Sequence, residues 1–157
     1  MIGLALAVAL LPATPPVCTE RTVQQTLVDG GRLTREDVDH GMVVDLVRCG
    51  DVTDDGSTDA VFTVASGGSA GDTRFGVLRG GADGAPVKLL LYRQGYSIGI
   101  ARHSRRAFDV IQPYYNRGDA NCCPSSFRVR RYTWNGSRFT VGKARKLKTA
   151  PSRFYKR

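Results

Sequence analysis

The feature that most restricts the fold of this chain is a series of short apolar segments that begins near residue 42. Glycine, aspartate or proline bounds each segment, and these residues favour turns between strands. The first six segments span residues 42–48, 60–65, 73–79, 87–93, 97–102 and 107–112. Phe127 and Val129 then alternate with arginines, a period of two that predicts a strand with one buried face. Asn135-Gly136 predicts a type I′ hairpin turn that leads into a further strand at 139–141.

One helix is predicted ahead of these strands. Thr19 is a suitable N-cap, Val23 and Leu27 lie four residues apart on one face, and Gly30-Gly31 ends the periodicity. The sequence therefore predicts an α+β fold: a mostly antiparallel β-sheet of about seven or eight strands with one N-terminal helix.

The chain of 157 residues has room for one domain. Residues 1–17 contain an apolar run too short to cross a bilayer, which needs roughly 20 residues. Such a run suits the apolar region of a signal peptide, although no basic residues precede it. We therefore expect a signal peptide at 1–17, one domain at 18–145, a loose basic tail at 146–157, and a secreted protein with no transmembrane segment once mature.

The four cysteines, Cys18, Cys49, Cys122 and Cys123, are an even number, which in an exported chain predicts disulfides. Three pairings are possible. A bond between the neighbours Cys122 and Cys123 requires an eight-membered ring, so we favour pairing each of them with Cys18 or Cys49. Pro16-Val17 before Cys18 is unlike a lipidation site, and two histidines with two distant cysteines suit zinc poorly.

The charge of the chain is unevenly distributed. The formal net charge is +9, and all fourteen acidic residues lie between Glu20 and Asp119. The segment after Cys123 is basic throughout, which predicts either a solvated basic face or a site for an anionic partner. The candidate anion-binding residues are Arg128, Arg130, Arg131, Arg138, Lys143, Arg145 and Lys146. We expect an anionic envelope polymer or acidic lipid headgroups as the partner, because export argues against nucleic acid.

A second candidate site is the aspartate-rich loop from Asp51 to Asp59. Asp51, Thr53, Asp55 and Asp59 can turn oxygens inward around the turn at Gly56, and calcium prefers six to eight oxygen ligands. The loop is similar to the D-x-[DN]-x-D-G-x-x-D loops of FG-GAP repeats. The alternative is a β-turn in which the carboxylates accept backbone N–H groups.

Catalysis has little support in the sequence. Nucleophilic catalysis needs a base held beside the nucleophile, and the only histidines, His40 and His103, lie in polar or basic stretches. The nucleophile-elbow, phosphate-loop and zinc-protease motifs are absent. We therefore expect a protein that is not an enzyme.

One resemblance adds to this interpretation. Four elements in order resemble the mycobacterial LppP/LprE-type exported lipoproteins: a helix, a strand that leads to Cys49, the hairpin segment Lys88 to Arg93, and Asn121-Cys122-Cys123-Pro124-Ser125 before Phe127. That family carries a Cys-Cys-Pro turn before two closing strands, with two more cysteines upstream. The resemblance implies export and this order of elements, and no defined activity.

Together these features predict an exported non-catalytic domain that associates with the cell envelope through an arginine-rich face. A first alternative is a secreted adhesion or inhibitor module with a calcium-bound Asp loop, whose contact surface includes the loops around Tyr114, Tyr115 and Cys122. A second is a hydrolase that uses a pair of aspartates.

Overall fold

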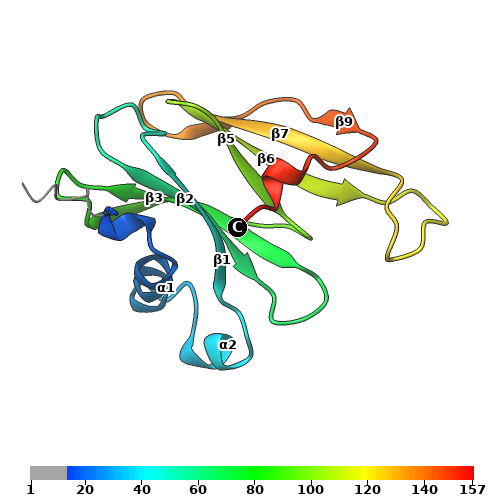
Figure 1. Ribbon diagram of the computed structural model, residues 1–157, viewed down its shortest axis with the longest axis horizontal. Helices are drawn as coiled ribbons and strands as arrows, with labels where there is room; N and C mark the ends of the chain where they lie inside the picture. Colours follow the sequence, from blue (N-terminus) through cyan, green and yellow to red (C-terminus); the bar gives the residue numbers. More distant parts are fainter. Residues whose placement is uncertain (1–13) are drawn as a thin grey trace, which may run out of the picture.

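Two antiparallel β-sheets lie face to face in the structure, a computed structural model that describes residues 14–157 (Figure 1). The first sheet has the order β1-β2-β3-β4 and contains β1 (Val44–Gly50), β2 (Asp59–Ala65), β3 (Asp72–Gly80) and β4 (Pro86–Gln94). The second has the order β5-β6-β7-β8 and contains β5 (Gly99–Ser104), β6 (Ala107–Tyr114), β7 (Ser126–Trp134) and β8 (Phe139–Val141). The short β9 (Arg145–Leu147) also pairs with β7. The predicted α+β class and the mostly antiparallel pairing are confirmed.

The helices cover the outer face of the first sheet. A 3-10 turn, η1 (Pro16–Cys18), leads into α1 (Glu20–Asp29), and the hydroxyl of Thr19 accepts the N–H of Thr22 as the predicted N-cap. Helix α2 (Arg35–Asp39) was not predicted, because its five residues are too few to show a helical period. The main helix therefore begins and ends where the sequence placed it.

The apolar core has three clusters, and the two larger ones lie one on each face of the first sheet. Between the two sheets, Val77 of β3 packs with Ile100 of β5 and Phe108 of β6. Outside the first sheet, Phe62 packs with Val23 and Leu27 of α1. Strand β2 is buried on both faces, so it has the continuous apolar sequence of an interior strand.

The start of the folded part differs from the predicted boundary at residue 18. Val17 is fully buried and its N–H donates to the carbonyl of Gly84 at 2.9 Å. The folded part therefore begins before Cys18. The remainder of the predicted signal peptide, residues 1–13, lies outside the described residues.

The prediction of a loose tail at 146–157 is wrong. Strand β9 pairs with β7, and the 3-10 turn η2 (Ser152–Phe154) places Phe154 on the outer face of the second sheet, where it is fully buried. Arg157 then forms an ion pair with Asp45 at 2.7 Å. Phe154, Leu147 and Ala150 of this basic segment pack on the apolar outer face of the second sheet, and this packing holds the segment in place.

The favoured disulfide pairing is also wrong. Cys18 is bonded to Cys49, which joins η1 to β1, and Cys122 is bonded to its neighbour Cys123. Cys122 and Cys123 belong to the loop between β6 and β7 in the second sheet, whereas Cys18 and Cys49 belong to the layers of the first. The fold thus keeps Cys122 and Cys123 apart from Cys18 and Cys49, and the predicted bonds between the two sets do not form.

The hairpin at Asn135-Gly136 forms, but its turn is not type I′. Trp134 is paired with Phe139, so the loop has four residues, and of Asn135 and Gly136 only Gly136 has a positive φ, +100°. The side-chain oxygen of Asn135 accepts the N–H groups of Ser137 and Arg138. These two hydrogen bonds close a longer loop in place of the tight turn.

Candidate anion-binding groove

The pairing of β6 with β7 decides which basic side chains lie together. Val110 is opposite Arg130 and Gln112 is opposite Arg128, with no shift of register along the pair. Side chains on opposed residues point to the same face, so these four lie on the face that looks toward the first sheet. They line a hollow of about 270 Å³, here named the arginine groove, whose walls are Val110, Gln112, Pro113, Tyr114, Arg128, Arg130 and Tyr132.

The groove exists because β6 and β7 of the second sheet extend beyond the first sheet, which covers the rest of this face. Near the middle of the strands this face belongs to the core, where the Phe108 ring stacks on Tyr132 with centroids 5.1 Å apart. Towards the loop between β6 and β7, the two strands extend past the first sheet (Figure 1). Arg128 and Arg130 occupy this uncovered part and are exposed.

The two arginines lack anionic partners. Within residues 14–157, neither Arg128 nor Arg130 forms an ion pair, and no acidic residue lines the groove. The guanidinium of Arg128 lies 3.5 Å from the centroid of the Tyr114 ring. Stacking of this kind holds the planar guanidinium in place and leaves its N–H donors directed outward.

A further arginine reaches the same region from the first sheet. Arg93 of β4 is paired with Phe75, a residue of the core between the sheets, so its side chain lies on the inner face. Burial raises the pKa of Tyr132, and the positive charges of Arg130 and Arg93 partly oppose that rise. The phenol of Tyr132 therefore lies in the field of both arginines.

The structure divides the predicted anion-binding residues into three groups. Arg128 and Arg130 line the groove, and Lys146 shares their face because it is paired with Arg128. Arg131 and Arg145 lie on the opposite face beside Asp109; Arg131 binds that carboxylate through two hydrogen bonds of 2.8 and 3.1 Å, and Arg145 lies 4.0 Å from it. The rest of the set is Arg138, in the β7–β8 loop, and Lys143, between β8 and β9; both are exposed.

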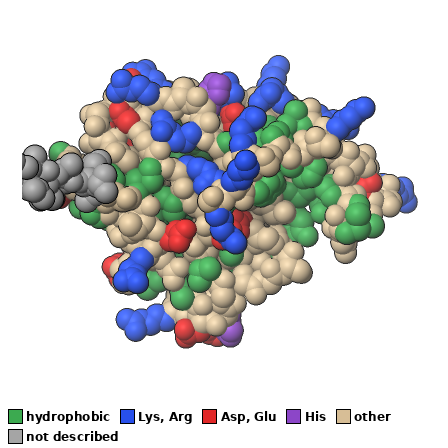
Figure 2. Space-filling model, viewed as in Figure 1, with side chains coloured by type: hydrophobic (Ala, Val, Ile, Leu, Met, Phe, Trp, Pro, Cys, Tyr) green, Lys and Arg blue, Asp and Glu red, His purple; other side chains and the backbone are tan. Residues whose placement is uncertain are grey.

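On the side of the molecule seen in Figure 2, lysine and arginine side chains project along the upper edge, over the second sheet. Acidic side chains are more frequent lower in that view, toward the first sheet. The asymmetry of charge along the sequence thus becomes an asymmetry between the two sheets, as expected for a surface that attracts anions.

Two polar residues of this region were not predicted: Gln112, which lines the groove, and Arg93, which approaches it from the first sheet. Gln112 lies two residues before Tyr114 and faces the same side, so the period of two was a usable signal once β6 and β7 were paired. Arg93 had no such signal, because its place in the groove region depends on how one sheet packs on the other.

In the aspartate loop, Asp59 is fully buried and fully hydrogen-bonded. Its carboxylate accepts the N–H groups of Val52, Thr53 and Gly80 at 2.9, 3.0 and 3.2 Å, and the Thr53 hydroxyl at 2.9 Å. Burial raises its pKa, and the four donors oppose that rise. Asp59 thereby fastens the loop to β3.

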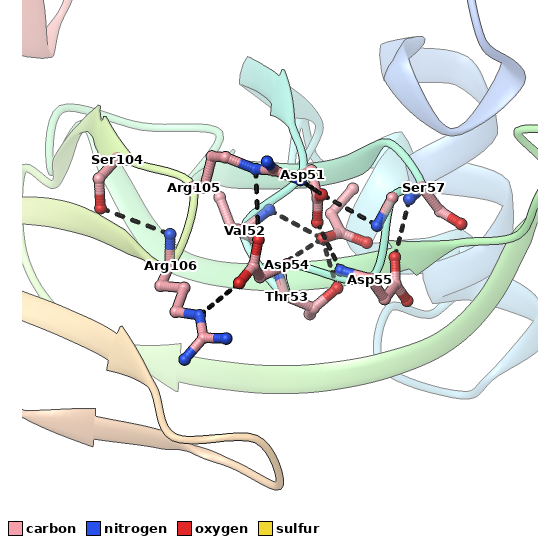
Figure 3. A network of polar contacts seen from close by, with 11 residues as sticks. Asp51, Val52, Thr53, Asp54, Asp55, Ser57, Ser104, Arg105 and Arg106 are labelled. Carbon is pink, nitrogen blue, oxygen red and sulfur yellow. Dashed lines mark hydrogen bonds and ion pairs between the residues drawn. The ribbon is translucent and has the colours of Figure 1, made fainter.

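Two other carboxylates of the loop, Asp51 and Asp54, point to arginines (Figure 3). Asp54 binds Arg105 and Arg106 from the β5–β6 hairpin at 3.2 and 2.6 Å. Asp51 binds Arg105 as well, at 3.1 Å. Since the loop belongs to the first sheet and the hairpin to the second, these ion pairs join the two sheets.

Of the predicted calcium ligands, Thr53 bonds to Asp59, Asp51 accepts the N–H groups of Asp55 and Gly56, and Asp55 binds Arg79 at 2.6 Å. Within the described residues, no three or more His, Cys, Asp or Glu side chains are grouped to hold a metal ion. The arrangement is that of the β-turn named as the alternative, and calcium binding stays a prediction.

An acidic pair does occur elsewhere. Asp45 and Asp72 line a cleft of about 330 Å³ together with Tyr155 and Arg157. Burial raises the pKa of Asp72, and the negative charge of Asp45 adds to the rise. Asp45 is held by Arg157, and Asp72 accepts the hydroxyl of Thr63 at 2.5 Å. Both carboxylates thus have partners that tie the C-terminal segment and β2 to the fold.

The chain matches no protein-family model, and neither the curated proteins nor the solved structures contain a match. The resemblance to LppP/LprE-type lipoproteins therefore stays a prediction. Within the described part of the chain, no helix has the length and apolar character needed to cross a bilayer.

Proposed function

We propose that this chain is an exported, non-catalytic domain that binds an anionic polymer of the cell envelope in the arginine groove. The observation that carries the proposal is the pair Arg128 and Arg130, which share a hollow face with aromatic walls and no acidic residue. Arg131, the next residue after Arg130, is already neutralised by Asp109. Within the described residues, the two groove arginines form no ion pair, so their N–H donors are free to bind an anion.

The geometry suits a chain of anionic groups better than a single small anion. Alternate residues of one strand lie about 6.6–6.8 Å apart, and adjacent strands lie about 4.8 Å apart. Arg128 and Arg130 are alternate residues of β7, and Lys146 is the cross-strand neighbour of Arg128. Successive phosphates or carboxylates of a linear polymer would meet these three cations in turn, with guanidinium groups able to bind each anion through two hydrogen bonds.

The test is retention of the folded protein on an immobilised phosphate polymer at increasing salt concentration. The double variant Arg128→Ala/Arg130→Ala should lose retention by at least about tenfold, because each charge-assisted hydrogen bond contributes about 1.5–3 kcal/mol. The matched control is Arg138→Ala/Lys143→Ala, which removes the same charge from exposed loops outside the groove and should change retention by less than about twofold.

Equal loss in both double variants would show attraction by net charge alone and would overturn the groove proposal. Vesicles with and without an anionic lipid form a second arm of the experiment. Retention on the polymer with no binding to anionic vesicles supports the envelope polymer. Binding to the vesicles alone would replace the polymer by a lipid headgroup.

A further inference from the structure

The loop between β6 and β7, residues 115–125, carries the disulfide between Cys122 and Cys123 and is here named the distal loop. Both cysteines are exposed. A disulfide stabilises a fold mainly by closing a loop of chain and so restricting the unfolded state. A bond between sequence neighbours closes no such loop, and an exposed one adds no packing. The Cys122–Cys123 bond therefore contributes little to stability, which indicates another role.

The distal loop is held by contacts that do not involve sulfur. The carboxylate of Asp119 accepts the N–H groups of Asn116 and Ser125, both at 2.8 Å, and the hydroxyl of Ser125 at 2.5 Å. The hydroxyl of Tyr115 donates to the carbonyl of Asn121 at 2.9 Å. These bonds join both ends of the loop, so it can keep its shape when the disulfide opens.

The other disulfide is half-buried. Cys18 packs against the core cluster of the first sheet, and its bond to Cys49 spans 31 residues. Opening it would free η1 and α1 from β1. Exposed disulfides are generally the labile or catalytic ones, whereas enclosed structural ones resist reduction.

We propose that Cys122 and Cys123 form a thiol–disulfide exchange site that opens and closes in the folded protein, with small dithiols as its substrate class. One thiolate of the dithiol attacks a sulfur of the pair, which forms a mixed disulfide and releases the other cysteine as a thiolate that takes a proton from water. The second thiol of the dithiol then loses its proton and attacks the other dithiol sulfur, the one bonded to the cysteine in the mixed disulfide. This step releases the remaining cysteine and closes the dithiol into its disulfide, so two electrons and two protons pass to the protein.

The test is an equilibrium titration of the oxidised full chain with mixtures of reduced and oxidised dithiothreitol. Each sample is trapped with iodoacetamide, and mass spectrometry of its peptides reports the labelling of each cysteine. Trp134 fluorescence reports the fold in the same samples. Cys122 and Cys123 should be half-labelled at a ratio of reduced to oxidised reagent at least tenfold lower than Cys18 and Cys49, with the fluorescence unchanged.

Two results would overturn the proposal: opening of both disulfides at the same ratio, or opening of the Cys122–Cys123 bond only as Trp134 fluorescence reports unfolding. Peptides that join Cys122 or Cys123 to Cys18 or Cys49 would do so as well. The variant Cys122→Ser/Cys123→Ser serves as the control. It should show no labelling at the low ratio and should keep its retention on the phosphate polymer, so that this proposal and the anion-binding proposal can fail separately.

Discussion

The first sheet covers one part of the β6–β7 pair and leaves the other part uncovered. The two strands pair without a register shift in both parts, but their inner faces carry different kinds of side chain. In the covered part, Phe108 and Tyr132 pack against Phe75 of the first sheet, and the Asp54–Arg106 ion pair joins the two sheets nearby. In the uncovered part, the same face presents arginines to a groove, and the strands lead to the distal loop. The comparison shows that one face of a strand pair can be apolar core where the other sheet covers it and carry exposed arginines where it does not.

Because β6 and β7 are paired along their whole length, the strands also hold the groove side chains in place. A cationic side chain on a paired strand needs less ordering on binding than one on a loose loop, so less of the interaction energy is lost.

Phe108→Ala should lower the free energy of unfolding by about 3–5 kcal/mol, since a fully buried ring that stacks on Tyr132 and meets the edge of Phe139 would leave a cavity. Arg128→Ala in the uncovered part should lower it by no more than about 1 kcal/mol, the contribution of an exposed cation–π contact. Denaturation by urea measures both. Similar values for the two variants would contradict the division into core and surface.

Removing the two disulfides should have unequal effects. Cys18→Ser/Cys49→Ser should cost about 3–4 kcal/mol, because the bond closes a separation of 31 residues in the unfolded chain. Cys122→Ser/Cys123→Ser should leave the unfolding temperature within about 1 °C, because it closes no loop. Thermal unfolding followed by circular dichroism distinguishes them, and a large loss in the second variant would show that the distal loop is structural.

Adjacent arginines of β7 should also differ. Arg131→Ala leaves the carboxylate of Asp109, only 5% exposed, without its main partner and should cost about 1–3 kcal/mol. Arg130→Ala removes no partner and should be neutral in stability while it weakens retention on the phosphate polymer. Chemical denaturation and the retention assay measure both variants. If the two arginines were assigned to the wrong faces of β7, Arg130→Ala would lower stability and Arg131→Ala would weaken retention.

The smallest expected effect concerns the aspartate loop. Because the carboxylates of Asp51, Asp55 and Asp59 already accept backbone N–H groups or bind arginines, the unfolding temperature in millimolar calcium and in chelator should agree within about 1 °C. A ligand at a hundred times its Kd would add about 2.7 kcal/mol, a rise of several degrees. Such a rise, lost in Asp55→Ala, would establish a calcium site.

Much of the fold was predictable because its signals are local. The capped helix at Glu20–Asp29 and eight of the strands follow from a capping threonine, a period of two and turn residues, all of which act within a few residues. Helix α2 was missed because it is too short to show a period, and β9 was missed because, unlike the equally short β8, it does not follow an Asn-Gly turn.

The candidate site was only half predictable. The basic composition pointed to the segment after Cys123, but it did not distinguish Arg130 from Arg131, which face opposite sides of β7. That distinction depends on which face the first sheet covers. It also depends on Asp109, which lies on another strand.

The sequence by itself determined the kinds of element in this protein, their order and the sign of its charge, because propensity, periodicity and composition act along the chain. Only the tertiary structure decided which cysteines are bonded, that Phe154 anchors the C-terminal segment, and that Arg128 and Arg130 lie in a groove. Each of these depends on how the sheets are placed, since contacts between residues far apart in sequence exist only once the layers have packed.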